Sequence, residues 1–341
     1  MAMNAMARAS EVTIDRDPEV SFTLPGRLYH DPAVFEDEKR RIFARSWHYA
    51  CPAADVARPG DYAAVELIDQ AVLVIRGRDG ALRAARNSGH VEGFDKAAFG
   101  LQPVRLEEQM GLVFVNLDSD APSLAEMAGD MFADMRAHLP WWDELVPFRD
   151  ERADVGFEFE QLSFNWKVLI DNCLECYHCE PAHPAFCDLI DMGSYRTTTH
   201  RWWSAAKSRL RKHDNAAYRV AEDSPSQRGD FWYLWPNLTF GVLPGQASFL
   251  VFIVEPAGPE TTLTKSDYFY RPGDAVSPAR AEYGRDVLWA EDKAICESVH
   301  RGLKSLGYRQ GRFIVDAGRS HISEHGVHHF QTLYAEAMGM L

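Results

Sequence analysis

The sequence has few cysteines, a deficit of basic residues and no long apolar run. Six cysteines in 341 residues are too few for the disulfide-bonded scaffold of a small secreted protein. Residues 1–12 lack the apolar segment of a secretory signal, so we expect a reduced, cytoplasmic protein. No stretch approaches the ~20 apolar residues that a membrane-spanning helix needs. We therefore do not expect an integral membrane protein.

The deficit of basic residues bears on the choice of partner. The chain has 36 Lys and Arg against 50 Asp and Glu, a net charge of −14. Nucleic acids and anionic membranes bind to basic surfaces, so we expect neither as a partner. With 46% hydrophobic and 12% aromatic residues, the composition is that of a folded globular protein. An enzyme acting on a small molecule fits these limits.

The apolar pattern divides the chain into three predicted parts. Residues 1–46 contain an amphipathic helix at 31–47. Residues 47–118 form a small β domain, with a hairpin signal at Asp79-Gly80 and strands at 62–67, 71–76, 82–86 and 111–117. Residues 119–341 form an α+β domain with an antiparallel sheet. Its predicted strands are 157–164, 196–203, 231–242, 249–256 and 262–270, and its predicted helices are 122–145, 165–177, 279–306 and 323–338.

Two histidines and a carboxylate form a candidate metal site. His178 and His183 are five residues apart, and Pro181 and Pro184 interrupt the helix around them, which lets both imidazoles face one point. Asp292 lies in a separate helical segment and could complete the two-histidine, one-carboxylate set of non-haem Fe(II) oxygenases. Without further context, two histidines at this spacing are as often ordinary surface or core residues.

The surrounding residues favour the metal site. The run from Asn165 to Pro184, with Glu175 three residues before His178, resembles the iron motif of Rieske-type aromatic-ring-hydroxylating and amine-demethylating oxygenases. Further similarity at 24–47, 59–76, 111–118, 292–303 and 323–330 covers most of the chain. The resemblance implies an alpha subunit with a small Rieske domain and a helix-grip (START-like) catalytic domain. It also implies mononuclear Fe(II) on His178, His183 and Asp292, with Glu175 as the catalytic carboxylate that passes electrons between subunits.

The ligands of the family's second cofactor are missing. A Rieske [2Fe–2S] cluster needs a C-x-H and a C-x2-H pair, but this chain has no C-x2-H and no cysteine between Cys51 and Cys173. Residues 87–94 run straight through the place where the cluster loops lie in the family, so we find no [2Fe–2S] ligands. Cys173, Cys176 and Cys179 could instead hold zinc or an Fe–S centre. We favour small apolar side chains packed behind the iron helix.

A second histidine group lies near the C-terminus. Its spacing would allow metal chelation on a helix, but the apolar residues Phe330, Leu333 and Tyr334 favour a packed or solvated helix. The group consists of His321, His325, His328 and His329.

Aromatic residues concentrate between positions 202 and 252, which line the substrate pocket in members of the resembled family. Aromatic faces bind quaternary ammonium groups through cation–π attraction, and this region most resembles the betaine- and carnitine-type branch. The same residues could instead be the core of a curved sheet. Our candidate substrate residues are Trp202, Trp203, Trp232, Trp235 and Phe240.

The resemblance implies an oxygenase, mono- or dioxygenase, that uses Fe(II) and O2 to hydroxylate or N-demethylate a small organic substrate. A quaternary ammonium substrate is favoured. Because the cluster ligands are missing, we expect electrons from a Rieske cluster on a partner subunit, with or without a flavin reductase, in a trimer or higher oligomer. Two alternatives stay open. The chain could be a non-catalytic structural subunit, or a cluster-deleted form of an ordinary ring-hydroxylating dioxygenase joined at Ser88-Gly89-His90.

Overall fold

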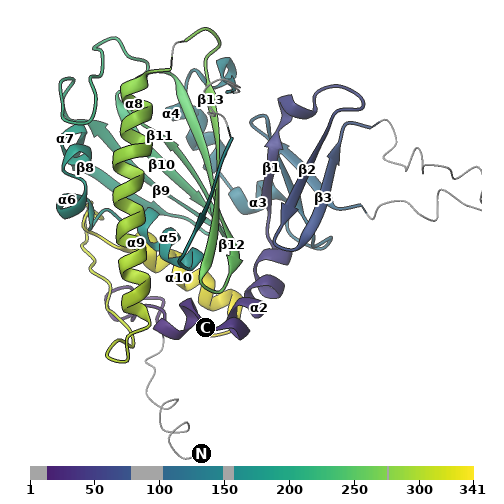
Figure 1. Cartoon of the computed structure of the whole chain (residues 1–341), viewed down its shortest axis with the longest axis vertical. Helices are drawn as coiled ribbons and strands as arrows, with labels where there is room; N and C mark the ends of the chain where they lie inside the picture. The colour runs from purple at the N-terminus through teal and green to yellow at the C-terminus, as the bar shows by residue number, and fades with distance from the viewer. Residues whose placement is uncertain (1–13, 78–102, 149–156, 275) are drawn as a thin grey trace, which may run out of the picture. The chain divides into compact units, whose positions relative to one another are not determined.

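The computed structural model describes residues 14–77, 103–148, 157–274 and 276–341 as two compact units (Figure 1). The first unit takes the chain up to Phe43 and from Met127 to Leu341, and the second is Ala44–Glu126. The predicted strand at 82–86, the Asp79-Gly80 hairpin and residues 87–94 lie outside the described residues. No described helix has the length and hydropathy needed to cross a membrane.

The second unit contains the small β domain predicted at 47–118. Its described strands form two antiparallel sheets around a core that includes Cys51, Val72 and Val115. One sheet has the order β1 (His48–Pro52), β5 (Leu112–Asn116), β4 (Arg105–Gln109), and the other pairs β2 (Tyr62–Leu67) with β3 (Gln70–Ile75). The 3-10 helices Phe43–Arg45 and Ala53–Val56 flank β1. β2 and β3 lie where the apolar alternation predicts strands.

The first unit is built on one eight-stranded antiparallel sheet, which confirms the predicted α+β class. Its order is β6 (Val146–Pro147), β13 (Thr261–Tyr270), β12 (Ser248–Gly258), β11 (Leu238–Val242), β10 (Arg228–Leu234), β9 (Trp203–Leu210), β8 (Ile190–Thr199), and β7 (Phe157–Leu162) also pairs with β13. Two predicted strands were too long. The chain turns at 200–202, so Trp203 begins a new strand, and Pro236 separates β10 from β11 because it has no N–H for the ladder.

Helices cover this sheet. Asn165 caps α5 by accepting a hydrogen bond from the Lys167 main-chain N–H at 3.0 Å. α8, a π-helical stretch and α9 form one run that crosses a face of the sheet (Figure 1), where Trp289 contacts Phe252 with ring centroids 5.7 Å apart. The α-helices are α2 (Pro32–Arg41), α3 (Leu124–Ala128), α4 (Met131–His138), α5 (Trp166–Cys173), α6 (Cys179–Ala182), α7 (Pro184–Leu189), α8 (Pro278–Glu282), α9 (Trp289–Leu303) and α10 (His325–Met338). The π stretch is Tyr283–Leu288, and further 3-10 turns are Gly26–Tyr29 and Trp142–Glu144.

Candidate metal centre

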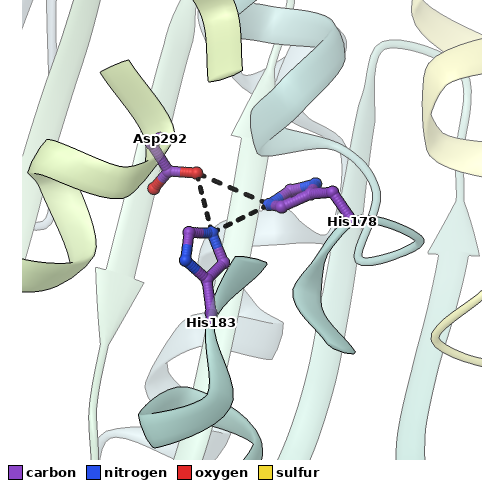
Figure 2. Close-up of side chains that lie close together, drawn as sticks. All are labelled: His178, His183 and Asp292. Atoms are coloured by element: carbon purple, nitrogen blue, oxygen red, sulfur yellow. Dashed lines mark hydrogen bonds and ion pairs between the residues drawn. The ribbon is translucent and has the colours of Figure 1, made fainter. Parts of the chain in front are cut away.

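Three side chains predicted as ligands converge at one point (Figure 2). α5 ends at Cys173, and the chain is irregular until α6, so His178 lies outside a regular helix. His183 lies between α6 and α7, where Pro184 starts the new helix. Asp292 comes from α9, more than 100 residues later in the chain. One donor atom of each residue lies within 4.8 Å of the other two.

The donor atoms face one another directly. Oδ1 of Asp292 lies 3.0 Å from Nε2 of His183 and 3.4 Å from Nε2 of His178, and the two Nε2 atoms are 3.1 Å apart. Two imidazole nitrogens and one carboxylate oxygen on a common face are the donor set of mononuclear non-haem iron. The residues present therefore fit a bound Fe(II).

A second layer of carboxylates holds both imidazoles. Nδ1 of His178 lies 2.5 Å from Oε1 of Glu175, and Nδ1 of His183 lies 2.8 Å from Oε2 of Glu291. A carboxylate on Nδ1 fixes the tautomer that presents a lone pair at Nε2, and it orients the ring. Glu291 was missed in the sequence, because a neighbour of a helical ligand ordinarily points about 100° away from it.

Hydrogen bonds set the charge of the candidate ligand side chains. Burial opposes ionisation of Asp292, but hydrogen bonds from His178 and His183 outweigh it and lower its pKa to about 2. Burial disfavours the charged form of His178, yet the hydrogen bonds to Asp292 and Glu175 raise its pKa to about 9. Asn172 on α5 donates from Nδ2 to Oδ1 of Asp292 at 2.7 Å. The site is a compact anionic pocket that favours a cation.

The cysteines beside His178 differ from the expectation of reduced thiols. Cys176 and Cys179 are buried, but they form a disulfide with their Cα atoms 4.9 Å apart. The three-residue spacing across one turn brings the two sulfur atoms within bonding distance. While bridged, neither sulfur is a thiolate ligand for zinc or an Fe–S cluster. Cys173 stays a free thiol.

A cavity of about 360 Å³ opens beside the three ligands. Trp232 and Phe240, two of the five predicted substrate residues, line it together with Phe231, Phe249, Phe252 and Trp289. The other three predicted residues lie elsewhere, in contacts that hold the fold. Trp202 lies under the Arg201 guanidinium, Trp203 stacks on His200 and Trp235 packs against Phe330. The periodic pattern could not separate cavity residues from core residues.

The C-terminal histidines do not gather around one point. Nε2 of His328 lies 2.8 Å from the main-chain oxygen of Asp15, and Nδ1 of His325 lies 2.8 Å from Oγ of Ser323. Among the residues that the structure describes, His178, His183 and Asp292 are the one group of three or more His, Cys, Asp and Glu donors close enough to hold a metal ion.

Comparison with known proteins gives a consistent result. The family model for the ring-hydroxylating alpha subunit (catalytic domain) matches residues 142–340. The carnitine monooxygenase oxygenase subunit of Acinetobacter pittii is 34% identical over 364 residues, covering 94% of this chain and 96% of the relative. The corresponding subunit of Escherichia coli K12 is 32% identical, with coverages of 94% and 95%.

Solved structures agree with the sequence relatives. A quaternary ammonium Rieske monooxygenase superposes with a TM-score of 0.85 at 29% identity, covering 96% of this chain and all of the other. Its complex with L-carnitine gives a TM-score of 0.81 at 29% identity, with 96% of this chain covered. The alignment with the Acinetobacter subunit is longer than the 341 residues of this chain. That relative therefore has internal segments that this chain lacks.

Proposed function

Because the chain belongs to the ring-hydroxylating oxygenase alpha-subunit family, we propose that it is an Fe(II)-dependent oxygenase acting on a quaternary ammonium compound. The observation that carries this proposal is the convergence of His178, His183 and Asp292 at the wall of an aromatic cavity. When bound, iron supplies the centre at which O2 is activated for hydroxylation. Relatives named for carnitine and glycine betaine support the substrate class.

The protein side chains divide the remaining work. His178, His183 and Asp292 would hold the metal at the wall of the cavity, which O2 and substrate can enter. Glu175 and Glu291 keep both imidazoles in the tautomer that binds metal. The aromatic rings of the sheet exclude water and attract a quaternary ammonium group through their faces. A substrate methyl or methylene next to the nitrogen is thereby held beside the metal.

We further propose that electrons come from a Rieske cluster on another polypeptide. The chain has no C-x2-H pair, and its alignment with a relative requires internal gaps in this chain. The structure of the quaternary ammonium Rieske monooxygenase is described as revealing inter-subunit electron transfer. Here Glu175 contacts His178, and the neighbouring Tyr177 is 51% exposed. This edge of the site is accessible to a partner that carries the cluster.

Metal and sulfide analysis tests the proposal. The purified chain is reconstituted with Fe(II) under anaerobic conditions and analysed for iron and acid-labile sulfide. We expect about one iron and no sulfide per chain. Turnover of a quaternary ammonium substrate should then appear when a Rieske-bearing donor is supplied. A flavin reductase without a Rieske protein should give none.

Three results would refute parts of this proposal. Failure of the wild-type chain to retain iron would favour the structural-subunit alternative. Acid-labile sulfide with two additional irons would refute the claim that the chain lacks a [2Fe–2S] cluster. Turnover with only a flavin reductase would refute the requirement for a Rieske-bearing partner. His183→Ala should lose the iron. His213→Ala, an exposed histidine outside the site, should keep it.

A further inference from the structure

The cavity has a cationic region well away from the metal ligands. Arg280 on α8 lines the same cavity as His178 and Asp292. It precedes Asp292 by twelve residues on the helical run that crosses the sheet (Figure 1). With a rise of 1.5 Å per residue in the α-helical parts and a smaller rise in the π stretch, the two backbone positions are at most roughly 18 Å apart along the helix axis. Arg280 therefore lies where the distal part of an elongated ligand would reach.

The charge of Arg280 is not neutralised by a carboxylate among the described residues. Its Nη2 donates to Oγ of Ser248 at 2.7 Å, and its Nη1 donates to the main-chain oxygen of Gln246 at 3.4 Å. The Tyr218 hydroxyl is a third hydrogen-bonding partner. All three partners are neutral, and they anchor the guanidinium at the cavity wall. A guanidinium has five N–H donors in a planar fork that fits a carboxylate. Donors therefore remain for an anionic ligand.

A neighbouring donor also lacks a partner. Nε2 of Gln246 is buried and makes no hydrogen bond to any residue that the structure describes. Its Oε1 accepts from the main-chain N–H of Ser277 at 2.8 Å, which fixes the orientation of the amide group. Gln246 lines the cavity beside Arg280. Because a buried donor without an acceptor is destabilising, a ligand oxygen at this position would satisfy it.

We propose that Arg280 and Gln246 form a carboxylate subsite, so that the substrate is a zwitterion with its quaternary ammonium group toward the metal ligands. This inference rests on the proposed function and specifies its substrate class. Glu175, Asp292 and Glu291 make the metal end of the cavity anionic, whereas Arg280 repels a cation from the distal end. The opposite charges at the two ends of the cavity therefore allow a zwitterionic substrate to bind in only one orientation. The carbon atoms next to nitrogen then face the metal, and the carboxylate points away from it.

Two matched ligands test the subsite by calorimetric titration of the full chain. γ-Butyrobetaine carries both charges, whereas butyltrimethylammonium has the same cation and a similar chain but no carboxylate. The wild-type protein should bind γ-butyrobetaine at least about tenfold more tightly, the range of one charged hydrogen-bonded contact. Arg280→Gln should bring this ratio close to one, and it should not weaken butyltrimethylammonium. Gln246→Leu should reduce the ratio severalfold.

A control arginine and a conservative variant keep the test decisive. Arg301→Gln changes an exposed arginine on α9 and should preserve the wild-type ratio. Arg280→Lys keeps the charge without the fork and should give an intermediate ratio, which covers the case that Arg280→Gln fails to fold. Equal affinities of the two ligands in wild-type protein would overturn the subsite. An equal loss of both affinities in Arg280→Gln would assign Arg280 a structural role.

The same samples separate this inference from the proposed function. Iron content is measured for each variant, and the titrations are repeated on protein prepared without iron. If the chain bound no iron but kept the tenfold preference, the oxygenase proposal would fail and the carboxylate subsite would stand. If it bound iron without the preference, the subsite would fail and the oxygenase proposal would stand.

Discussion

The first unit contains two buried clusters of polar side chains. They differ in whether their hydrogen-bonding atoms find all their partners within the cluster. The Glu38 cluster joins Glu38 on α2 to Trp166, Lys167 and Tyr334. Lys167 Nζ and Tyr334 OH each donate to Oε1 of Glu38 at 2.6 Å, and Trp166 Nε1 donates to Oε2 at 2.9 Å. The Glu38 and Lys167 side chains are both 0% exposed. Each polar atom of these four side chains has a hydrogen-bond partner inside the cluster, so the cluster needs no ligand from outside the chain.

The metal site of His178, His183 and Asp292 does not close in this way. With Nδ1 of each imidazole directed at a carboxylate, Nε2 of the neutral ring is a lone pair. Two such lone pairs and a carboxylate oxygen then face one another at 3.0 to 3.4 Å. In the metal-free protein, protons on the imidazoles bridge these atoms: against the effect of burial, the hydrogen bonds to Asp292 and Glu175 raise the pKa of His178 to about 9. A metal ion would replace these protons. A buried cluster whose hydrogen bonds are all internal stabilises the fold, whereas a cluster that needs protons or a metal ion from solution is suited to binding.

The largest expected effect is loss of the metal in Asp292→Ala. In the wild-type protein, free Fe(II) at a thousand times its dissociation constant should raise the free energy of unfolding by about 4 kcal/mol. Asp292→Ala should abolish this increment and turnover, because two histidines without the carboxylate no longer form the ligand set. Thermal unfolding with and without Fe(II) measures the increment.

The matched control for that variant is Asp286→Ala. Asp286 is an exposed aspartate in the π stretch that precedes α9, and it pairs with Arg285. It should keep the full increment. An iron-dependent increment of wild-type size in Asp292→Ala would mean that this carboxylate is not a ligand.

Glu38→Gln should have the opposite effect: it should lower the stability of the metal-free protein and leave the increment given by Fe(II) unchanged. Removing the negative charge leaves the Lys167 ammonium buried without a counter-ion, which costs about 3–5 kcal/mol of unfolding free energy. The increment given by Fe(II) should not change, because the Glu38 cluster takes no part in metal binding. Urea unfolding measures the loss. Glu36→Gln, on the exposed side of the same helix, should cost less than about 1 kcal/mol.

Two results would contradict the distinction between the clusters. One is a small loss of unfolding free energy in Glu38→Gln, and the other is a change in the increment that Fe(II) gives this variant. The first result would show that the Glu38 cluster contributes little to stability. The second would show that the two clusters act as one network.

Glu291→Gln tests a side chain that contacts the candidate metal site without being one of its three candidate ligands. Glu291 holds Nδ1 of His183 but is not itself part of the three-ligand set. Replacing its carboxylate should weaken Fe(II) binding by about 10–100-fold and leave the metal-free stability close to wild type. Competition with a chelator measures the affinity. Glu297→Gln on the same helix is the control, and equal affinities for the two variants would exclude a positioning role for Glu291.

The sequence predicted the parts of this protein that depend on local pattern. Apolar alternation placed β2, β7 and β13, helical spacing placed α9 and α10, and the resemblance assigned the family that the comparisons confirm. The helix predicted at 122–145 was wrong, because the chain there forms α3, α4 and a 3-10 turn. The sequence did not predict the turns at 200–202 and at Pro236, because residues that favour strands, threonine and aromatic or aliphatic residues, lie on both sides of each turn. The aromatic residues posed the same problem, since core and cavity positions follow one pattern.

The contacts that complete the site join distant parts of the chain. Glu291 meets His183 across 108 positions, and Asn172 meets Asp292 across 120. Gln246 approaches Arg280 only because β12 and α8 are brought together by the fold. A single sequence carries no signal for such pairs. Two contacts of the site do have a visible three-residue spacing, Glu175–His178 and the Cys176–Cys179 disulfide. The disulfide was not predicted, because cysteines that bind a metal have the same spacing.

Asp171 on α5 carries the smallest predicted effect and lies between the two clusters. Tyr29 OH donates to its Oδ2 at 2.7 Å, and Gln331 Nε2 donates to its Oδ1 at 3.0 Å. Burial raises the pKa of Asp171 to about 7, against hydrogen bonds and the nearby Lys167 that lower it. A carboxyl with a raised pKa binds more protons in the folded state than in the unfolded state. Its contribution to stability is therefore present at about pH 4 and is lost as the pH rises through about 7.

Asp171→Asn removes this titration and tests whether the space between the clusters is neutral or charged. At pH 5 the variant should be less stable than wild type, because its amide cannot accept from Gln331 and Tyr29 equally well. The stability difference between variant and wild type should narrow by about 2–3 kcal/mol between pH 5 and pH 8, as the wild type loses stability and the variant does not. Asp214→Asn, an exposed aspartate, should show no such trend. A constant gap would mean that Asp171 is already ionised at pH 5, and that α5 links the two clusters through a charge rather than a neutral acid.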